Sequence, residues 1–232
     1  MHALNLGAPA GRRLEVLCIG AHCDDIEIGC GGTVMALQRS RPDCRIHWLV
    51  LTSVPARKAE AEASARAFVE ETCRGEIRVC ALPDGLLPAH FAAVKGHFED
   101  LKAAIEPDLI FTHHGQDRHQ DHSLASQVTW QTFRNHMIWE YEIPKYDGDL
   151  CTPNMYVPLT EADAARKAAA VMRLFTSQHG KSWFKADNLL AAMRLRGLES
   201  RAPSGYAEGF HCRKLVWGGD AAADPHEHEA AR

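Results

Sequence analysis

Short apolar segments alternate with longer amphipathic segments along the first two-thirds of this chain. Four of the apolar segments have the length and composition of buried strands, at residues 14–20, 45–52, 76–82 and 108–112. Between them, residues 57–73 and 89–105 carry apolar side chains at helical spacing. Strands and helices that alternate in this way form a parallel sheet with helices on both faces. We therefore expect a single α/β domain built on a mostly parallel sheet.

The length and charge of the chain narrow the classes of protein that it can belong to. Its 232 residues suffice for one substantial core, expected over residues 1–217, while residues 218–232 have little to bury and should be disordered. The net charge of −4 leaves no basic stripe for a phosphate backbone, so we expect no nucleic-acid partner. No membrane span and no secretory signal are expected either, which predicts a cytoplasmic location.

The eight cysteines are scattered and form no C-x-x-C pair. This spacing argues against a structural zinc knuckle. In a chain without a secretory signal we expect reduced thiols, several of them buried as small apolar side chains.

Polar side chains follow the first predicted strand, in the stretch Gly20-Ala21-His22-Cys23-Asp24-Asp25. Glycines at 29, 31 and 32 come next, and a helix is expected from about residue 33 to 39. One imidazole and two carboxylates are therefore expected on the loop at the end of a strand. Ligands of open α/β sheets bind at these strand ends.

A second polar cluster follows the fourth predicted strand. Residues 113–122 contain four histidines and two aspartates, a density that solvation alone does not explain. Catalytic zinc takes about three protein ligands from His, Asp or Glu and keeps one position open. His22 and Asp25 can reach a common point, and His122 can complete the set from the second cluster. Asp24 lies between His22 and Asp25 in sequence and is free to approach a metal-bound water. The three ligands suffice for one ion, so we expect one Zn²⁺ per chain.

These two clusters resemble the paired motifs of the PIG-L/LmbE-like zinc-dependent N-deacetylase family. The family's A-H-P-D-D-E…G-G-T signature is similar to Ala21-His22-Cys23-Asp24-Asp25 with Gly31-Gly32-Thr33, and its T-H…D-x-H-x-D-H motif is similar to Thr112-His113 with residues 117–122. Its S-Q and Y-A-E-x-F elements resemble Ser177-Gln178 and residues 206–210. The resemblance spans about residues 14–217. It implies a Rossmann-like fold and a small-molecule substrate, an N-acetylated amino sugar or a metabolite that contains one.

The resemblance also implies roles for individual residues. His22, Asp25 and His122 would be zinc ligands, and Asp24 would be the general base. His119, oriented and held charged by Asp121, would steady the developing oxyanion. Cys23 and Gln120 stand where the family commonly has proline, and its Arg-Gly-Glu stretch after the second strand is absent. Arg57 is the residue that can supply the missing guanidinium.

Several residues remain open at this point. His113 and His114 are adjacent, so their side chains point in different directions, and each has a substrate contact and a packed histidine as alternatives. Asp117 is expected to orient the loop or a ligand histidine, because metal-bound imidazoles usually donate their second N–H. Glu208 is either an ordinary carboxylate at an exposed strand edge or, by the resemblance, a residue of the substrate pocket.

Two other classes compete with the deacetylase. The strand, Gly-rich loop and helix also open a nucleotide-binding or sugar-binding Rossmann-like module, but Gly29-Cys30-Gly31-Gly32 is not G-x-G-x-x-G, and Asp24 and Asp25 would repel a pyrophosphate. A metal-dependent phosphohydrolase usually holds two metal ions about 4 Å apart, whereas the sequence offers ligands for one. The identity of the acylated substrate and a homo-oligomeric state are left open.

Overall fold

The computed structural model describes residues 12–216, which form one α/β domain around a seven-stranded sheet. The sheet has the order β3-β2-β1-β4-β5-β7-β6. Its strands are β1 (Glu15–Gly20), β2 (Arg45–Thr52), β3 (Arg74–Leu82), β4 (Leu109–His113), β5 (Met137–Tyr141), β6 (Met155–Pro158) and β7 (Ala207–His211). Strands β1 to β5 pair in parallel, and β7 is antiparallel to β5 and to β6. The predicted mostly parallel sheet is confirmed.

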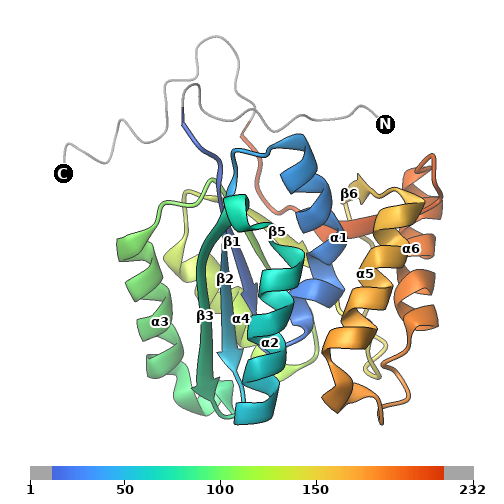
Figure 1. Ribbon diagram of the computed structural model, residues 1–232. Coiled ribbons are helices and arrows are strands. Elements are labelled where there is room, and N and C mark those ends of the chain that lie inside the picture. The colour runs from blue at the N-terminus through green and yellow to red at the C-terminus, as the bar shows by residue number, and fades with distance from the viewer. Residues whose placement is uncertain (1–11, 217–232) are drawn as a thin grey trace.

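Helices cover both faces of this sheet (Figure 1). The α-helices are α1 (Asp25–Ser40), α2 (Pro55–Phe68), α3 (Phe91–Ala104), α4 (Gln120–Thr132), α5 (Glu161–Leu174) and α6 (Ala186–Ser200), with short 3₁₀ turns η1 (Glu71–Cys73), η2 (Leu87–His90) and η3 (Thr176–Gln178). Because side chains alternate along a strand, Val16 and Cys18 of β1 join a core with α1, α2, α5 and α6, while Leu17 and Ile19 join one with α3 and α4.

The position of β1 in the sheet brings the two predicted polar clusters together. Strand β1 lies between β2 and β4 and is parallel to both. The residues that follow β1 and those that follow β4 therefore leave the sheet at the same edge, although about ninety residues separate them in sequence.

Helix α1 begins much earlier than the sequence predicts. It starts at Asp25, directly after its N-cap residue Asp24, so Gly29, Gly31 and Gly32 lie inside a helix and not in a loop. A Cβ atom at Gly29 would lie 2.1 Å from the Tyr141 ring, and one at Gly31 would lie 2.6 Å from the Phe68 ring. The glycines let α1 pack closely against its neighbours. The expected start near residue 33 was wrong because glycine usually disfavours helix interiors.

Other expectations concern the cysteines and the end of the chain. All eight cysteines are free, and seven of them are buried, as expected for reduced thiols. The last described strand, β7, ends at His211. The predicted tail at 218–232 lies outside the described residues. Among the helices of residues 12–216, none is both long and apolar enough to cross a membrane.

Candidate metal centre

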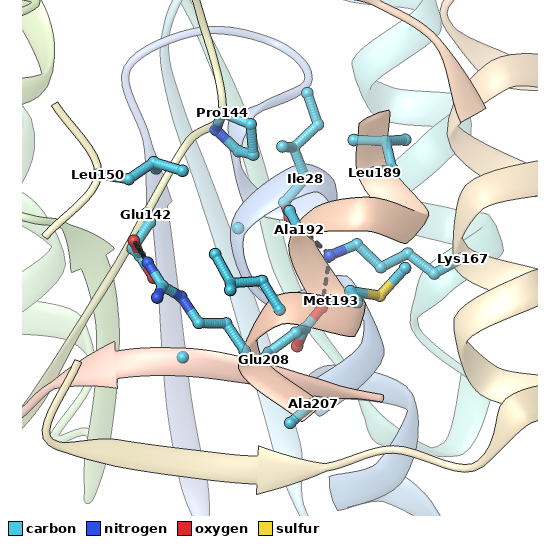
Figure 2. A pocket seen from close by; sticks show the side chains of 14 residues that line it. Ile28, Glu142, Pro144, Leu150, Lys167, Leu189, Ala192, Met193, Ala207 and Glu208 are labelled. Carbon is cyan, nitrogen blue, oxygen red and sulfur yellow. Dashed lines mark hydrogen bonds and ion pairs between the residues drawn. The ribbon is translucent and has the colours of Figure 1, made fainter. Parts of the chain in front are cut away.

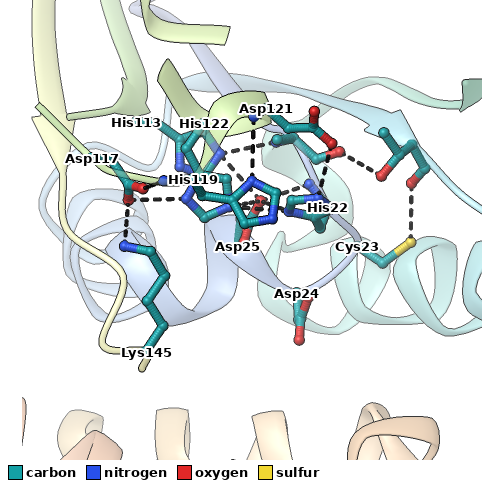
Figure 3. A network of polar contacts seen from close by, with 12 residues as sticks. His22, Cys23, Asp24, Asp25, His113, Asp117, His119, Asp121, His122 and Lys145 are labelled. Atoms are coloured by element: carbon teal, nitrogen blue, oxygen red, sulfur yellow. Dashed lines mark hydrogen bonds and ion pairs between the residues drawn. The ribbon is translucent and has the colours of Figure 1, made fainter. Parts of the chain in front are cut away.

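Three ligand atoms from the two polar clusters converge at the edge of the sheet. His22 Nδ1 lies 3.0 Å from His122 Nε2 and 3.3 Å from Asp25 Oδ2, and the last two atoms are 3.5 Å apart. Tetrahedral zinc with bonds of 2.0–2.1 Å places its ligand atoms about 3.3 Å from one another. The edges of the triangle that these atoms form, 3.0 to 3.5 Å, are of that size. Figure 3 shows how the three side chains converge. The sequence-predicted set of His22, Asp25 and His122 is therefore brought together in a geometry that fits zinc.

Local structure positions each of the three side chains. His22 lies on the loop after β1, Asp25 is the first residue of α1, and His122 lies in the first turn of α4. The carboxylate of Asp25 accepts a hydrogen bond from the backbone N–H of His22, at 2.6 Å. Burial alone would raise the pKa of Asp25, but His122, His113 and His22 around it hold that pKa well below its usual value. Asp25 is thus an ionised carboxylate, which is the form that binds a metal.

The outer nitrogen atoms of both ligand histidines face carboxylates. His122 Nδ1 lies 2.9 Å from Asp117 Oδ2, and the same oxygen accepts a hydrogen bond from Lys145 at 2.9 Å. His22 Nε2 lies 3.0 Å from Asp84 Oδ1 and 3.4 Å from Asp121 Oδ2. Metal-bound imidazoles in proteins commonly have such carboxylates on their far side. Asp117 therefore contacts His122, one of the two histidines expected as ligands.

His113 is fully buried against His122 and Asp25. Its ring stacks on that of His122 with centroids 3.9 Å apart, and its Nε2 is 3.1 Å from Asp25 Oδ2 and 2.9 Å from the Ala21 backbone nitrogen. Burial, with a further contribution from His122, lowers the pKa of His113 to about 4. His113 is therefore a neutral, buried neighbour of the ligands.

His114 points away from the centre. It contacts Glu140 at 2.8 Å through Nδ1 and stacks on His211. The two adjacent histidines therefore have different environments, as their positions at a strand end predict.

Asp24 is buried beside the centre but stands apart from the three ligand side chains (Figure 3). Its Oδ1 accepts a hydrogen bond from Arg57 at 2.7 Å, whereas its Oδ2 is buried without a hydrogen-bond partner in residues 12–216. Burial raises the pKa of Asp24, and the nearby Arg57 opposes that shift. Arg57 thus supplies a guanidinium to the site, as expected, and Asp24 keeps one carboxylate oxygen available.

The predicted pairing of the Asp121 carboxylate with His119 does not occur among the described contacts. The carboxylate of Asp121 accepts hydrogen bonds from the backbone of Gly85 at 2.7 Å and of Leu87 at 3.0 Å, and it faces His22. Only the backbone N–H of Asp121 reaches His119, where it donates to Nδ1 at 3.3 Å. His119 is the N-cap residue of α4, so the start of the helix fixes its ring.

The expectation that His119 is held charged is not supported either. Burial, together with the neighbouring His122 and His22, lowers the pKa of His119. Because Nδ1 accepts a hydrogen bond, the proton of the neutral ring is on Nε2. His119 is therefore oriented as a neutral donor.

Two further residues of the site were missed from the sequence. Asp84 was given no role from the sequence, yet its carboxylate lies 3.0 Å from His22. Asp84 follows β3, a third parallel strand. Ligands bind at the carboxyl ends of parallel strands, so this position could have indicated Asp84. Lys145 donates hydrogen bonds to Asp117, at 2.9 Å, and to Asp149, at 2.6 Å. No local motif marks it, since its role depends on how the loop after β5 folds back.

Glu208 is buried and is not a carboxylate at an exposed strand edge. It is buried in a pocket wall and accepts hydrogen bonds from Lys167 at 2.5 Å and from the α1 backbone at Gly32 and Thr33, at 2.9 and 2.6 Å (Figure 2). Lys167 also donates to the carbonyl of Ile28, at 2.6 Å. Glu208 therefore joins β7 to α1 as half of a buried ion pair, and it is not an exposed edge residue.

Comparison with known proteins identifies similar sequences. A family model described as PIG-L, GlcNAc-PI de-N-acetylase, matches residues 17–133, a range that contains every residue of the triangle. The chain is 25% identical over 150 residues to the uncharacterized deacetylase YaiS of Escherichia coli K12, an alignment that covers 58% of this chain and 77% of YaiS.

Solved structures share the fold. The N,N'-diacetylchitobiose deacetylase of Pyrococcus horikoshii superposes with a TM-score of 0.64 at 22% identity, over 85% of this chain and 83% of that one. GalB, the 4-carboxy-2-hydroxymuconate hydratase of Pseudomonas putida KT2440, superposes with a TM-score of 0.70 at 15% identity, over 90% and 100%. Since one neighbour is a deacetylase and the other a hydratase, the fold alone does not select a reaction.

Proposed function

The chain belongs to the PIG-L family, and from this premise we propose that it is a zinc-dependent N-deacetylase. The reaction is hydrolysis of an N-acyl group, acetyl in the simplest case, from an amino sugar or a metabolite that contains one. The observation that carries the proposal is the triangle of His22 Nδ1, Asp25 Oδ2 and His122 Nε2, with edges of 3.0 to 3.5 Å. These three residues would hold one zinc ion.

Zinc in this position would supply a Lewis acid that acidifies water and polarises the amide carbonyl. The protein would supply the base. Asp24 is close to the ligands but is not one of them, and its Oδ2 has no hydrogen-bond partner within the described residues. Asp24 would accept the proton of the attacking water, while Arg57 holds the other carboxylate oxygen in place. Once protonated, Asp24 can return the proton to the departing amine.

His119 would stabilise the oxyanion as a neutral donor. Its Nδ1 is occupied by the Asp121 backbone N–H, so its Nε2–H is free to point at developing negative charge. A fixed donor of this kind needs no imidazolium, which agrees with the lowered pKa of His119. Asp117 and Asp121 would act on the ligand histidines as positioning residues.

The proposal is tested by loading the full chain with one equivalent of zinc and offering a panel of N-acetylated amino sugars. The panel should contain free, disaccharide and lipid-linked forms, with p-nitrophenyl phosphate as the substrate of the competing phosphohydrolase class. We expect release of free amine from at least one sugar, and loss of that release after chelation. Phosphate release without amine release would contradict the proposal.

A further inference from the structure

The two edges of the sheet differ in how much backbone they offer to another strand. Strand β6 forms one edge; it has four residues and ends at Pro158, which has no N–H to donate. Strand β3 forms the other edge; it has nine residues, more than any other strand in residues 12–216, and contains no proline. In Figure 1, β3 lies between α3 and α2, and neither helix crosses it.

Strand β3 pairs only with β2 among the described strands, so the backbone groups on its outer side have no strand partner. A long edge strand without proline readily pairs with a strand of another chain. We propose that β3 pairs with β3 of a second copy of this chain, antiparallel and about a two-fold axis at Ile77. The two sheets then continue into each other, and the contact does not depend on the proposed function.

The middle of β3 is regular enough to accept another strand. Residues 77–79 pair with residues 48–50 of β2 in unbroken register, whereas the register shifts on either side of them. Such irregularities bend a strand and make it less able to pair. The centre of the proposed interface is therefore the regular segment, and its charged side chains determine the register.

Glu76 and Arg78 are two residues apart, so their side chains lie on the same face of β3. They form an ion pair within the strand, with Arg78 Nη2 2.7 Å from Glu76 Oε1, and their side chains are 39% and 28% exposed. In an antiparallel pair centred on Ile77, Glu76 of each copy is directly opposite Arg78 of the other. Opposite charges that face each other across antiparallel strands stabilise the pair.

The neighbouring registers bring like charges together. A two-fold axis requires residues on the same face to lie opposite each other, so the centre of the pair can move only from one residue to the next. Centring the pair on Glu76 places two glutamates opposite each other, and centring it on Arg78 does the same with two arginines. Like charges directly opposite each other destabilise a strand pair. The charge pattern therefore favours Ile77 as the centre.

The other face of β3 is compatible with the same centre. Ile77 is partly buried and packs against the core that β1 forms with α1, α2, α5 and α6. At the two-fold axis it lies opposite Ile77 of the second copy. Branched apolar side chains form stabilising pairs across strands, so the core extends over the axis on this face while the ion pairs form on the other.

The interface can be tested by sedimentation velocity of the full chain over a range of protein and salt concentrations. We expect a monomer–dimer equilibrium that is weaker at high salt, because exposed ion pairs are screened. Arg78→Glu leaves two carboxylates on this face and Glu76→Arg leaves two guanidinium groups. Each variant alone should raise the dissociation constant of the dimer by about tenfold or more, since two attractive pairs become repulsive. Arg166→Glu, which changes an exposed arginine on α5, is the matched control and should dimerise like the wild type.

Mixing the two variants separates a direct charge contact from damage to the fold. In the proposed register, both arginines of the Glu76→Arg chain face both glutamates of the Arg78→Glu chain. An equimolar mixture should therefore form a heterodimer, although each variant alone is mainly monomeric. The double variant Glu76→Arg/Arg78→Glu carries the same charges in reverse order and should dimerise by itself. Thermal unfolding of each protein verifies that it is folded.

Three results would overturn the proposal. The first is a wild-type chain that stays monomeric at every concentration. The second is an oligomer that both single variants leave unchanged, which would place the interface elsewhere on the molecule. The third is a mixture of the two folded variants that stays monomeric, which would show that Glu76 and Arg78 do not face each other across a two-fold axis.

Discussion

Helix α1 carries one buried polar cluster at its start and another at its middle, and the two are built differently. At the middle, Lys167 and Glu208 are 2% and 3% exposed and form an ion pair that also binds the helix backbone. The lysine donates to Glu208 and to the Ile28 carbonyl, and the glutamate accepts from two amides. The charges cancel and the groups have partners, so this cluster needs nothing further.

At the start of α1, the cluster around Asp25 is incomplete. Three histidines surround one carboxylate oxygen, while Asp24 Oδ2 is buried without a hydrogen-bond partner in the described part of the chain. Buried polar atoms normally find partners, and those that lack them are concentrated at functional sites. The difference between the clusters indicates that the cluster at the middle of α1 stabilises the fold, whereas the cluster at its start is the one proposed to bind a metal ion and a substrate. Each prediction below changes one of them, in order of the effect on turnover.

The largest effect should follow removal of a ligand. His122→Ala deletes one corner of the triangle, so bound zinc should fall sharply and amine release should be abolished. His114→Ala is the matched control, because His114 is a half-buried histidine of the same segment but contacts Glu140 instead. It should retain zinc. Metal analysis of the dialysed proteins provides the measurement, and full zinc occupancy in His122→Ala would exclude this residue as a ligand.

The next effect should come from Asp24→Asn. The amide can still accept the hydrogen bond from Arg57 but cannot accept a proton, so kcat should fall by about 10²–10⁴-fold, the usual contribution of a general base. Zinc content should stay the same because Asp24 is not a ligand. Steady-state kinetics on the zinc-loaded variant provides the measurement. Near-normal turnover would rule out the assigned role.

His119→Ala should lower kcat by about 10²–10³-fold, the effect of one lost oxyanion donor. Asp121→Ala tests how the two residues are related. Alanine at this position keeps the backbone N–H that donates to His119. It loses the carboxylate that accepts hydrogen bonds from the Gly85 and Leu87 amides and faces His22. We therefore expect the two effects to multiply in the double variant, since the side chains act through different contacts. A double variant no worse than His119→Ala alone would restore the direct Asp121–His119 pair that the sequence suggested.

Sequence reasoning predicted the mostly parallel sheet and the convergence of His22, Asp25 and His122 because both depend on local patterns. Apolar segments of strand length predict the sheet, and the density of histidine and aspartate after two strands predicts a metal centre. His22, Asp25 and His122 lie at strand ends that a parallel sheet brings together.

The remaining features depend on tertiary contacts that no local pattern encodes. The early start of α1 follows from close packing of Gly29 on Tyr141, which is more than a hundred residues away. The Asp121 carboxylate faces away from His119 because the turn at Gly85 offers it two backbone amides. Glu208 is buried because Lys167 lies opposite it. Gly29, Asp121 and Glu208 can be singled out in the sequence, but the tertiary packing determines which groups they contact.

The smallest effect on turnover is expected from the complete cluster. Lys167→Met leaves Glu208 buried without its cation, which should cost about 3–5 kcal/mol of unfolding free energy. Turnover per folded molecule should nevertheless stay unchanged, because neither residue contacts the metal centre. Adding Glu208→Gln removes the unpaired charge and should recover part of the lost stability, while Lys102→Met, an exposed lysine on α3, should change it by no more than about 0.5 kcal/mol. Denaturant unfolding and zinc-loaded kinetics measure the two quantities separately. A loss of turnover in folded Lys167→Met would mean that the middle of α1 controls the position of Asp25, and the two clusters would then be one functional unit.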